Sequence, residues 1–398
     1  MNEQLKADEA KYVMQTYKRA GVEFVRGEGA LLFDDEGSEY LDFLGGISVA
    51  SVGHCHPEVV EAIRVQTGEL QHVSNLFYTG PMVQLAKRLS ESSLGGKVFF
   101  CNSGTEANEA AIKIARKAAR ARGVENPEII SFEGDFHGRS YGSLSATPGL
   151  ATNPDFAPML PGFRSVPFDD AEALRAAVNE RTAAVLIEPM QGEAGIFPVS
   201  DETLVAARQA CDEVGALLIF DEVQTGIGRT GSLWAYEQGP VRPDVMTTAK
   251  ALGGGMAIGA CIGNPETGEV LTAGDHGSTF AAGPVASSAA LTVLDLVDDP
   301  VMLRRVRSLG DALAEGLKRI EGVTEVRGRG LMLGVGLADG IVAADVNSTL
   351  LERGLVANAP RPDSLRLLPP FVLTDDQAER AISVIEETLA GYHPVESK

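Results

Sequence analysis

The sequence predicts an α/β fold, in which a large domain with a mostly parallel central sheet flanked by helices is joined to a smaller α+β domain. The chain has 398 residues, 44% of them hydrophobic, which is enough to bury a sizeable core in more than one domain. Between about residues 96 and 262, short apolar runs alternate with helical patterns, as in a parallel sheet covered on both faces. After about residue 290, striped helices and glycine-separated strands take over, which is typical of an α+β unit.

The first 60 residues consist of strand and turn patterns, such as ALLFDDEGSEYLDFL with its Glu-Gly turn, and they do not continue the parallel series. We therefore expect residues 1–60 to join the small domain, residues 61–290 to form the large domain, and residues 291–398 to form the rest of the small domain. The small domain is then built from both chain ends.

The strands expected in the large domain are the apolar runs KVFFC, EIISF, AAVLIEP, ALLIFDE and AIGACIG. Between the first two runs, an apolar stripe predicts a helix from Gly104 to Arg122. Ser103 lies three residues before Glu106, which is the spacing of a capping box, and basic residues gather before Gly123. Both ends suit the helix dipole.

The expected elements after residue 300 follow in a short series. Leucines and an isoleucine stripe a helix around residues 309–320, and VTEVR and LMLGVGL are typical of strands. A helix at about 343–353, a strand near SLRLLPPFVLT and a last helix from Asp375 complete the chain.

Composition excludes several classes of function. Thirty-four basic against fifty-five acidic residues leave a formal charge of −21, which repels nucleic acid and anionic lipid. No apolar run approaches the roughly 18 residues of a membrane helix, and the N-terminus lacks a signal-peptide core, so we expect a soluble, cytoplasmic protein. The four cysteines form no CxxC pair, which argues against a disulfide framework or a metal site.

Two residues follow apolar runs where ligands bind in open α/β sheets, at the carboxyl ends of the strands. Asp221 ends one run, and Lys250 ends another, directly before a glycine run that allows a ligand close to the backbone. The alternative is a solvated acid and a solvated lysine at strand ends.

A third feature also indicates a ligand site. Ser103, Gly104 and Thr105 open the predicted helix, so their N–H groups and hydroxyls are free to hold an anion such as phosphate. An ordinary capped helix is the alternative.

Three other patterns mimic functional motifs. Residues 226–231 spell the dinucleotide fingerprint GxGxxG, but the segment that follows is too short for the helix that would carry a pyrophosphate. His54, Cys55 and His56 cannot all turn to one metal, and Pro57 is typical of the first residue of a helix. His137 has no nucleophile in a recognised elbow nearby, and we interpret it as structural or as a neighbour of a bound ring.

Taken together, the motifs resemble class III aminotransferases, which are fold type I pyridoxal-phosphate enzymes. The similarity runs from about Tyr12 to the final helix and is greatest to the acetylornithine-specific members, with the ornithine-specific members next. It rests on seven motifs in the family's order: SGTEANEAAIKIAR, FHGR, EPMQGEAG, FDEVQTGIGRTG, TTAKALGGG, HGSTF and RLLPP.

The resemblance implies that pyridoxal 5′-phosphate is the cofactor and that Lys250 forms a Schiff base with it. Asp221 would pair with the ring nitrogen and keep it protonated, which makes the ring an electron sink. A lysine buried beside cations has a lowered pKa, so Lys250 would serve as nucleophile and then as base. The other cofactor-binding residues implied are Ser103, Gly104 and Thr105 at the phosphate, Phe136 and Val223 on the two ring faces, and Gln224 at the phenolic oxygen.

The resemblance also implies a homodimer whose active sites lie at the subunit interface, with Thr279 of the partner completing the phosphate site and Ser278 near the substrate. The family commonly continues with Gly-Asn-Pro, whereas this chain has Ala-Ala-Gly-Pro at 281–284. Arg139 and Arg366 match two arginines that bind substrate carboxylates, since guanidinium groups hold carboxylates bidentately. A structural salt bridge is the alternative for both arginines.

The resemblance further implies that Glu193 pairs with Arg366 while an ω-amine substrate is bound and releases it for the α-carboxylate of glutamate. Tyr17 matches a tyrosine that contacts substrate. The implied reaction transfers the terminal amino group of N2-acetyl-L-ornithine to 2-oxoglutarate, a step of arginine biosynthesis. Ornithine, succinylornithine or lysine-type ω-amine donors are alternatives, and a nicotinamide-dependent dehydrogenase is the alternative from another class.

Overall fold

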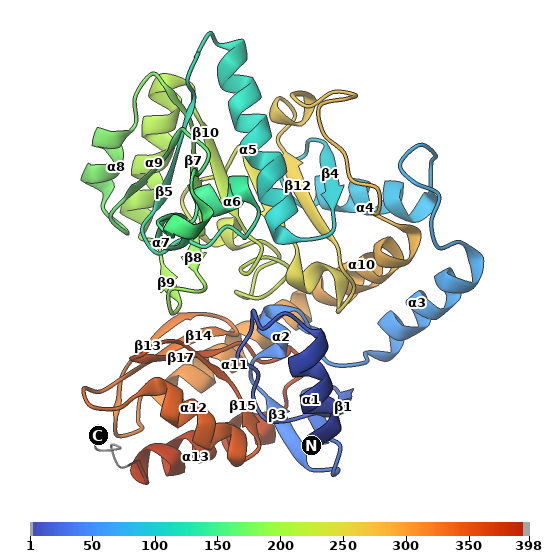
Figure 1. Ribbon diagram of the computed structural model, residues 1–398, viewed down its shortest axis with the longest axis vertical. Coiled ribbons are helices and arrows are strands. Elements are labelled where there is room, and N and C mark those ends of the chain that lie inside the picture. Colours follow the sequence, from blue (N-terminus) through green and yellow to red (C-terminus); the bar gives the residue numbers. More distant parts are fainter. Residues whose placement is uncertain (1–2, 393–398) are drawn as a thin grey trace.

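The computed structural model describes residues 3–392 and places a seven-stranded sheet at the centre of the larger body (Figure 1). Only β12 runs antiparallel to its neighbours, so the sheet is mostly parallel, as predicted. The edge strand β6 was not among the predicted strands, because its residues are largely exposed and give no apolar run. In order across the sheet, the strands are β4 Val98–Cys101, β12 Gly259–Gly263, β11 Val245–Thr248, β10 Leu217–Asp221, β7 Thr182–Ile187, β5 Glu128–Phe132 and β6 Phe163–Val166.

Both faces of this sheet are buried, which explains why its strands are continuous apolar runs rather than alternating ones. Ile219 packs on the face covered by α5 (Gly104–Ala121), while its neighbours Leu218 and Phe220 pack on the opposite face against α9 (Asp201–Val214). The remaining helices around the sheet are α3 Pro57–Glu69, α4 Gly80–Glu91, α6 Tyr141–Ser145, α7 Pro148–Ala151, α8 Ala171–Ala177 and α10 Pro284–Val297.

A second body carries two four-stranded sheets and lies below the first in Figure 1. One sheet has the order β1 Phe24–Glu28, β2 Leu31–Asp34, β3 Glu39–Asp42, β15 Leu355–Val356, so strands from both chain ends share it. The other has the order β13 Val323–Arg329, β14 Met332–Leu337, β17 Ser364–Leu367, β16 Asn358–Arg361. The helices here are α1 Glu3–Tyr12, α2 Gly45–Ser48, α11 Pro300–Leu317, α12 Ala343–Glu352 and α13 Asp375–Ala390. The exact domain boundaries stay a prediction.

The short elements include the hairpin of β8 (Met190–Gln191) and β9 (Phe197–Pro198) and four 3-10 turns, η1 Pro154–Phe156, η2 Ala235–Gln238, η3 Lys250–Gly253 and η4 Thr267–Glu269. Only η2 follows the fingerprint-like loop 226–231 before β11, so no helix is present there to receive a pyrophosphate. Its glycines serve packing instead: a Cβ at Gly228 would lie 2.4 Å from Val297, and one at Gly231 would lie 2.3 Å from Arg307.

Two smaller expectations can be compared with the structure. Helix α3 begins at Pro57, as predicted, and His54 hydrogen-bonds the buried Asp42 at 2.6 Å. Among residues 3–392, no helix is both long enough and apolar enough to cross a membrane.

Candidate active site

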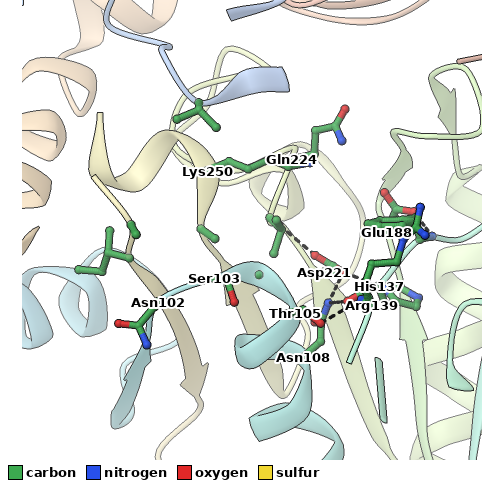
Figure 2. A pocket seen from close by; sticks show the side chains of 18 of the residues that line it. Asn102, Ser103, Thr105, Asn108, His137, Arg139, Glu188, Asp221, Gln224 and Lys250 are labelled. Atoms are coloured by element: carbon green, nitrogen blue, oxygen red, sulfur yellow. Dashed lines mark hydrogen bonds and ion pairs between the residues drawn. The ribbon is translucent and has the colours of Figure 1, made fainter. Parts of the chain in front are cut away.

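A cavity of about 420 Å³ lies at the edge where the carboxyl ends of β4, β5, β7, β10 and β11 meet. This is the edge at which open α/β sheets bind ligands. Figure 2 shows the side chain of Lys250 extending towards Gln224, with Asp221, His137 and Asn108 gathered beside it. The predicted site residues among its lining are Ser103, Gly104, Thr105, Phe136, Arg139, Asp221, Val223, Gln224 and Lys250.

Asp221 is held as a buried carboxylate at the end of β10. Asp221 is only 4% exposed. Its Oδ2 accepts hydrogen bonds from Asn108 Nδ2 at 2.7 Å and from His137 Nδ1 at 2.8 Å. Its Oδ1 accepts from the N–H of Val223 at 3.0 Å. Thr247 Oγ1 also donates to Oδ1 at 3.3 Å, so four donors hold this one carboxyl group in place.

His137 lies beneath the cavity between two carboxylates. Its Nε2 is 3.5 Å from Asp135 Oδ2, an ion-pair distance rather than a good hydrogen bond, while Nδ1 bonds Asp221. Burial opposes the charged imidazole, but the interactions with Asp135 and Asp221 outweigh it and raise the pKa of His137 to about 10. The imidazole therefore places positive charge directly against Asp221. His137 is therefore more than the structural residue suggested by its sequence context.

Lys250 follows β11 and begins η3 with φ of 39°, a left-handed conformation that is strained for a residue with a Cβ. The Lys250 side chain lines the cavity and is otherwise enclosed by protein. Burial, with Arg366 in the same sense, lowers the pKa of the Lys250 amine despite the opposing charge of Glu193. No hydrogen bond or ion pair occupies this amine within residues 3–392. A lysine with a lowered pKa and a free amine can act as a nucleophile.

The N-terminus of α5 faces the cavity, but its hydroxyl groups are not free. Ser103 donates to Glu106 Oε2 at 2.8 Å, and Thr105 Oγ1 lies 2.6 Å from Ser143 Oγ. Both hydroxyls thus already have partners in the helix cap and a neighbouring turn, and their contact with an anion stays a prediction. The groups left for a phosphate are the N–H groups of Gly104 and Thr105, since the first N–H groups of a helix have no partner within it. Glu106 accepts from the N–H of Asn102 at 2.9 Å, one residue before the cap, so the capping box is only half formed.

Two residues are placed to enclose a flat ring. Val223 lies against Gly104, where an added Cβ would be 2.6 Å from Val223 Cγ1, and Phe136 lines the cavity with the Arg139 guanidinium 5.5 Å from its ring centre. Their contacts with a ring stay a prediction.

Arg366 projects from β17 and is fully buried. Its Nη1 donates to Glu193 Oε1 at 2.6 Å and to Gln224 Oε1 at 3.2 Å, and its Nε donates to Asn358 Oδ1 at 3.1 Å. Burial raises the pKa of Glu193, but the charge of Arg366 reverses this effect, and the pKa is lowered. Within residues 3–392, Nη2 of Arg366 has no hydrogen-bond partner. A buried guanidinium with an unused donor is prepared for a further anion.

Five predicted residues do not line this cavity. Glu193 and Arg366 reach it only through Gln224, which both contact by hydrogen bonds. The other three are further removed. Tyr17 is 75% exposed, and Thr279 is exposed on the segment before α10. Ser278 Oγ accepts a hydrogen bond from Asn102 Nδ2 at 2.9 Å, which connects it to the cavity only through Asn102.

Sequence reasoning missed two groups in the site. Asn108 holds Asp221, and only its place in SGTEANEAA could have indicated it. Glu188 follows β7, is buried, and accepts the N–H groups of Phe136 at 2.8 Å and Gly192 at 3.0 Å. Burial and the neighbouring carboxylates raise the pKa of Glu188 to about 8.

Comparison with known proteins defines the class. The family model Aminotransferase class-III matches residues 12–389. The acetylornithine aminotransferase of Caldanaerobacter subterraneus is 44% identical, over 96% of this chain and 98% of its own length. The ornithine aminotransferase structure from Toxoplasma gondii superposes with a TM-score of 0.93 at 33% identity, covering 98% of this chain and 94% of that one. The N-acetylornithine aminotransferase structure from Stenotrophomonas maltophilia gives 0.84 at 36%, covering 96% and 98%.

The fold and the site therefore define an aminotransferase. More particularly, the chain belongs to the class III aminotransferases, which are pyridoxal-phosphate enzymes. The groups around the cavity fit this cofactor: an acid held by hydrogen bonds for a ring nitrogen, an unpaired amine for an aldehyde, and a helix N-terminus for a phosphate.

Proposed function

We propose that the chain transfers the terminal amino group of N2-acetyl-L-ornithine to 2-oxoglutarate, giving N-acetyl-L-glutamate 5-semialdehyde and L-glutamate, in the cytoplasm and as a step of arginine biosynthesis. Acetylornithine aminotransferases that are 41% and 45% identical to this chain support this substrate. The four free thiols support a reducing compartment.

The residues around the cavity divide the work. When bound, pyridoxal phosphate supplies a ring that withdraws electrons from the substrate carbon. Asp221 would accept the N–H of the ring nitrogen and so favour the protonated ring, and His137 holds Asp221 in place by a hydrogen bond. Lys250 would hold the cofactor through its amine, and once the substrate amine has displaced it, the freed Nζ would move the proton from the substrate carbon. The N–H groups at the start of α5 bind the phosphate.

The observation that carries the substrate class is the Glu193–Arg366 pair, closed at 2.6 Å beside Gln224, which lines the cavity. While Glu193 neutralises the charge of Arg366, the site does not require a substrate carboxylate beside the reacting amine. A substrate with a terminal amine can therefore bind. When Glu193 moves away, Arg366 can bind the α-carboxylate of glutamate, while Arg139 binds the more distant carboxylate. One site thereby accepts both partners of the reaction.

Ornithine is the second candidate donor, and the higher TM-score to an ornithine enzyme favours it. The score measures the backbone, however, whereas the choice of donor depends on a few side chains.

Steady-state kinetics with N-acetylornithine, ornithine and succinylornithine as amino donors test the proposal. We expect kcat/KM to be at least about tenfold higher for N-acetylornithine than for free ornithine, and equal values would contradict it.

We also propose a homodimer in which Thr279 reaches the partner's phosphate site. Thr279 is exposed next to Phe280, and large exposed apolar side chains lie in the same region: Leu76 at 83%, Phe77 at 66%, Tyr78 at 96% and Phe280 at 71%. Monomeric proteins rarely expose such clusters. Light scattering after gel filtration should give twice the chain mass, and Thr279→Ala should weaken cofactor binding. A monomer with full activity would contradict the dimer.

A further inference from the structure

The turn that carries Arg139 is tied to α5 by hydrogen bonds to its backbone. Thr105 Oγ1 accepts the N–H groups of Arg139 at 3.1 Å and of Ser140 at 3.2 Å. The same hydroxyl lies 2.8 Å from Ser140 Oγ and 2.6 Å from Ser143 Oγ. The path of the main chain at Arg139 is therefore determined by side chains of another element.

Glu109, one turn further along α5, holds the other side of the turn. Its Oε1 accepts the N–H of Gly142 at 2.8 Å, the N–H of Ser143 at 3.1 Å and the hydroxyl of Ser140 at 2.6 Å. Ser140 occupies the N-cap of α6 but makes no side-chain cap bond, so the Glu109 carboxylate takes this place. Bonds to a carboxylate are stronger than bonds between neutral groups, which makes Glu109 the strongest single acceptor in the turn.

Two glycines allow these close contacts. A Cβ at Gly142 would lie 2.2 Å from Glu109 Oε2, and a Cβ at Gly138 would lie 2.2 Å from Thr105 Oγ1. Gly138 also has φ of 135°, which other residues rarely adopt. The glycines on the two sides of Arg139 therefore leave room for the Thr105 and Glu109 side chains of α5.

The side chain of Arg139, unlike its backbone, has few contacts with the protein. It is exposed at the cavity, and within residues 3–392 no carboxylate forms an ion pair with it; its guanidinium lies 5.5 Å from the Phe136 ring. The hydrogen bond from its N–H to Thr105 fixes where its side chain leaves the main chain. Glu109 does not line the cavity and can influence a ligand only through the turn.

We propose that Glu109 is a positioning residue for carboxylate recognition, which fixes the 138–143 turn against α5 and so directs Arg139 into the cavity. This inference rests on the proposed role of Arg139 in binding substrate carboxylates. It assigns a function to an acid that touches neither substrate nor cofactor.

The test compares Glu109→Ala, Glu109→Gln and Arg139→Ala as holoenzymes. We expect Arg139→Ala to raise KM for N-acetylornithine and for 2-oxoglutarate about 100-fold, and Glu109→Ala to raise both about 5- to 30-fold with kcat changed less than about twofold. Glu109→Gln, which keeps one acceptor oxygen, should have a smaller effect. In the double variant, Glu109→Ala should add nothing to Arg139→Ala, because both act on one interaction.

A donor without a carboxylate separates positioning from general damage. N-acetyl-1,4-diaminobutane has the same reacting amine as N-acetylornithine, so its kcat/KM should be equal in wild type and Glu109→Ala. Glu202→Gln, at an exposed acid of α9, controls for the loss of one negative charge. Gly142→Ala should reproduce the effect if Glu109→Ala does not fold.

The outcomes distinguish two failures. Unchanged KM values in Glu109→Ala and Gly142→Ala, while Arg139→Ala raises them, would overturn the role of Glu109. So would an equal loss with N-acetyl-1,4-diaminobutane. Unchanged KM values in Arg139→Ala would overturn the proposed role of Arg139 instead.

Discussion

Replacing His137 by glutamine removes a positive charge from between two buried carboxylates. Nδ1 lies 2.8 Å from Asp221 and Nε2 3.5 Å from Asp135, and the three side chains are at most 3% exposed. Burial disfavours the charge of His137, but both carboxylates raise the pKa from 6.5 to about 10. A difference of this size corresponds to an interaction of about 5 kcal/mol.

The sign of the pH dependence follows from this pKa. Because the pKa is higher in the folded than in the unfolded protein, the stabilisation is fully present below pH 6.5 and is lost as the pH rises through 10. His137→Gln should therefore reduce the free energy of unfolding by about 3 to 5 kcal/mol near pH 6.5, as for other broken buried pairs. The difference from wild type should shrink towards pH 10.

Urea unfolding at a fixed protein concentration, from pH 6.5 to 10.5, measures this difference directly. His72→Gln, at an exposed histidine, is the matched control and should stay close to wild type throughout. A His137→Gln defect that is absent, or that is as large at pH 10.5 as at pH 6.5, would refute a charged His137 beneath the site.

Three further substitutions test the cavity. Asp221→Ala should keep part of the bound cofactor, measured by absorbance, but lose turnover about 1,000-fold, because nothing then favours a protonated ring nitrogen; near-normal turnover would contradict this. Glu193→Gln leaves Arg366 uncompensated, so the ratio of kcat/KM for glutamate to that for N-acetylornithine should rise about tenfold in single half-reactions, and an unchanged ratio would argue against the pair. Gly104→Ala places a Cβ 2.6 Å from Val223 Cγ1, so the cofactor dissociation constant should rise about tenfold, whereas equal affinity would mean that Val223 does not bound the ring site.

The buried strands could be predicted because both of their faces pack against helices. The predicted run ALLIFDE became β10, and the run KVFFC became β4 followed by a helix that starts at Gly104. By contrast, β6 is a short edge strand whose two middle residues, Arg164 and Ser165, are exposed, so its four residues form no apolar run.

The catalytic pair was predictable for a topological reason. Asp221 ends β10 and Lys250 closely follows the neighbouring parallel strand β11, and the carboxyl ends of such strands meet at one edge. The groups that support them were not predictable in the same way. Asn108 and His137 reach Asp221 from a helix and a turn, and only the folded chain shows that three separate segments meet at one carboxylate. The sequence also did not predict that the Ser103 hydroxyl bonds Glu106 and that the Thr105 hydroxyl bonds the 138–143 turn.

Reduction of the holoprotein with borohydride, followed by peptide mapping, tests most directly whether this cavity binds the cofactor through the amine that follows β11. The account predicts one labelled peptide, modified at Lys250, and no stable label in Lys250→Ala. A label on another lysine, or a fully active enzyme that takes up no label, would contradict it.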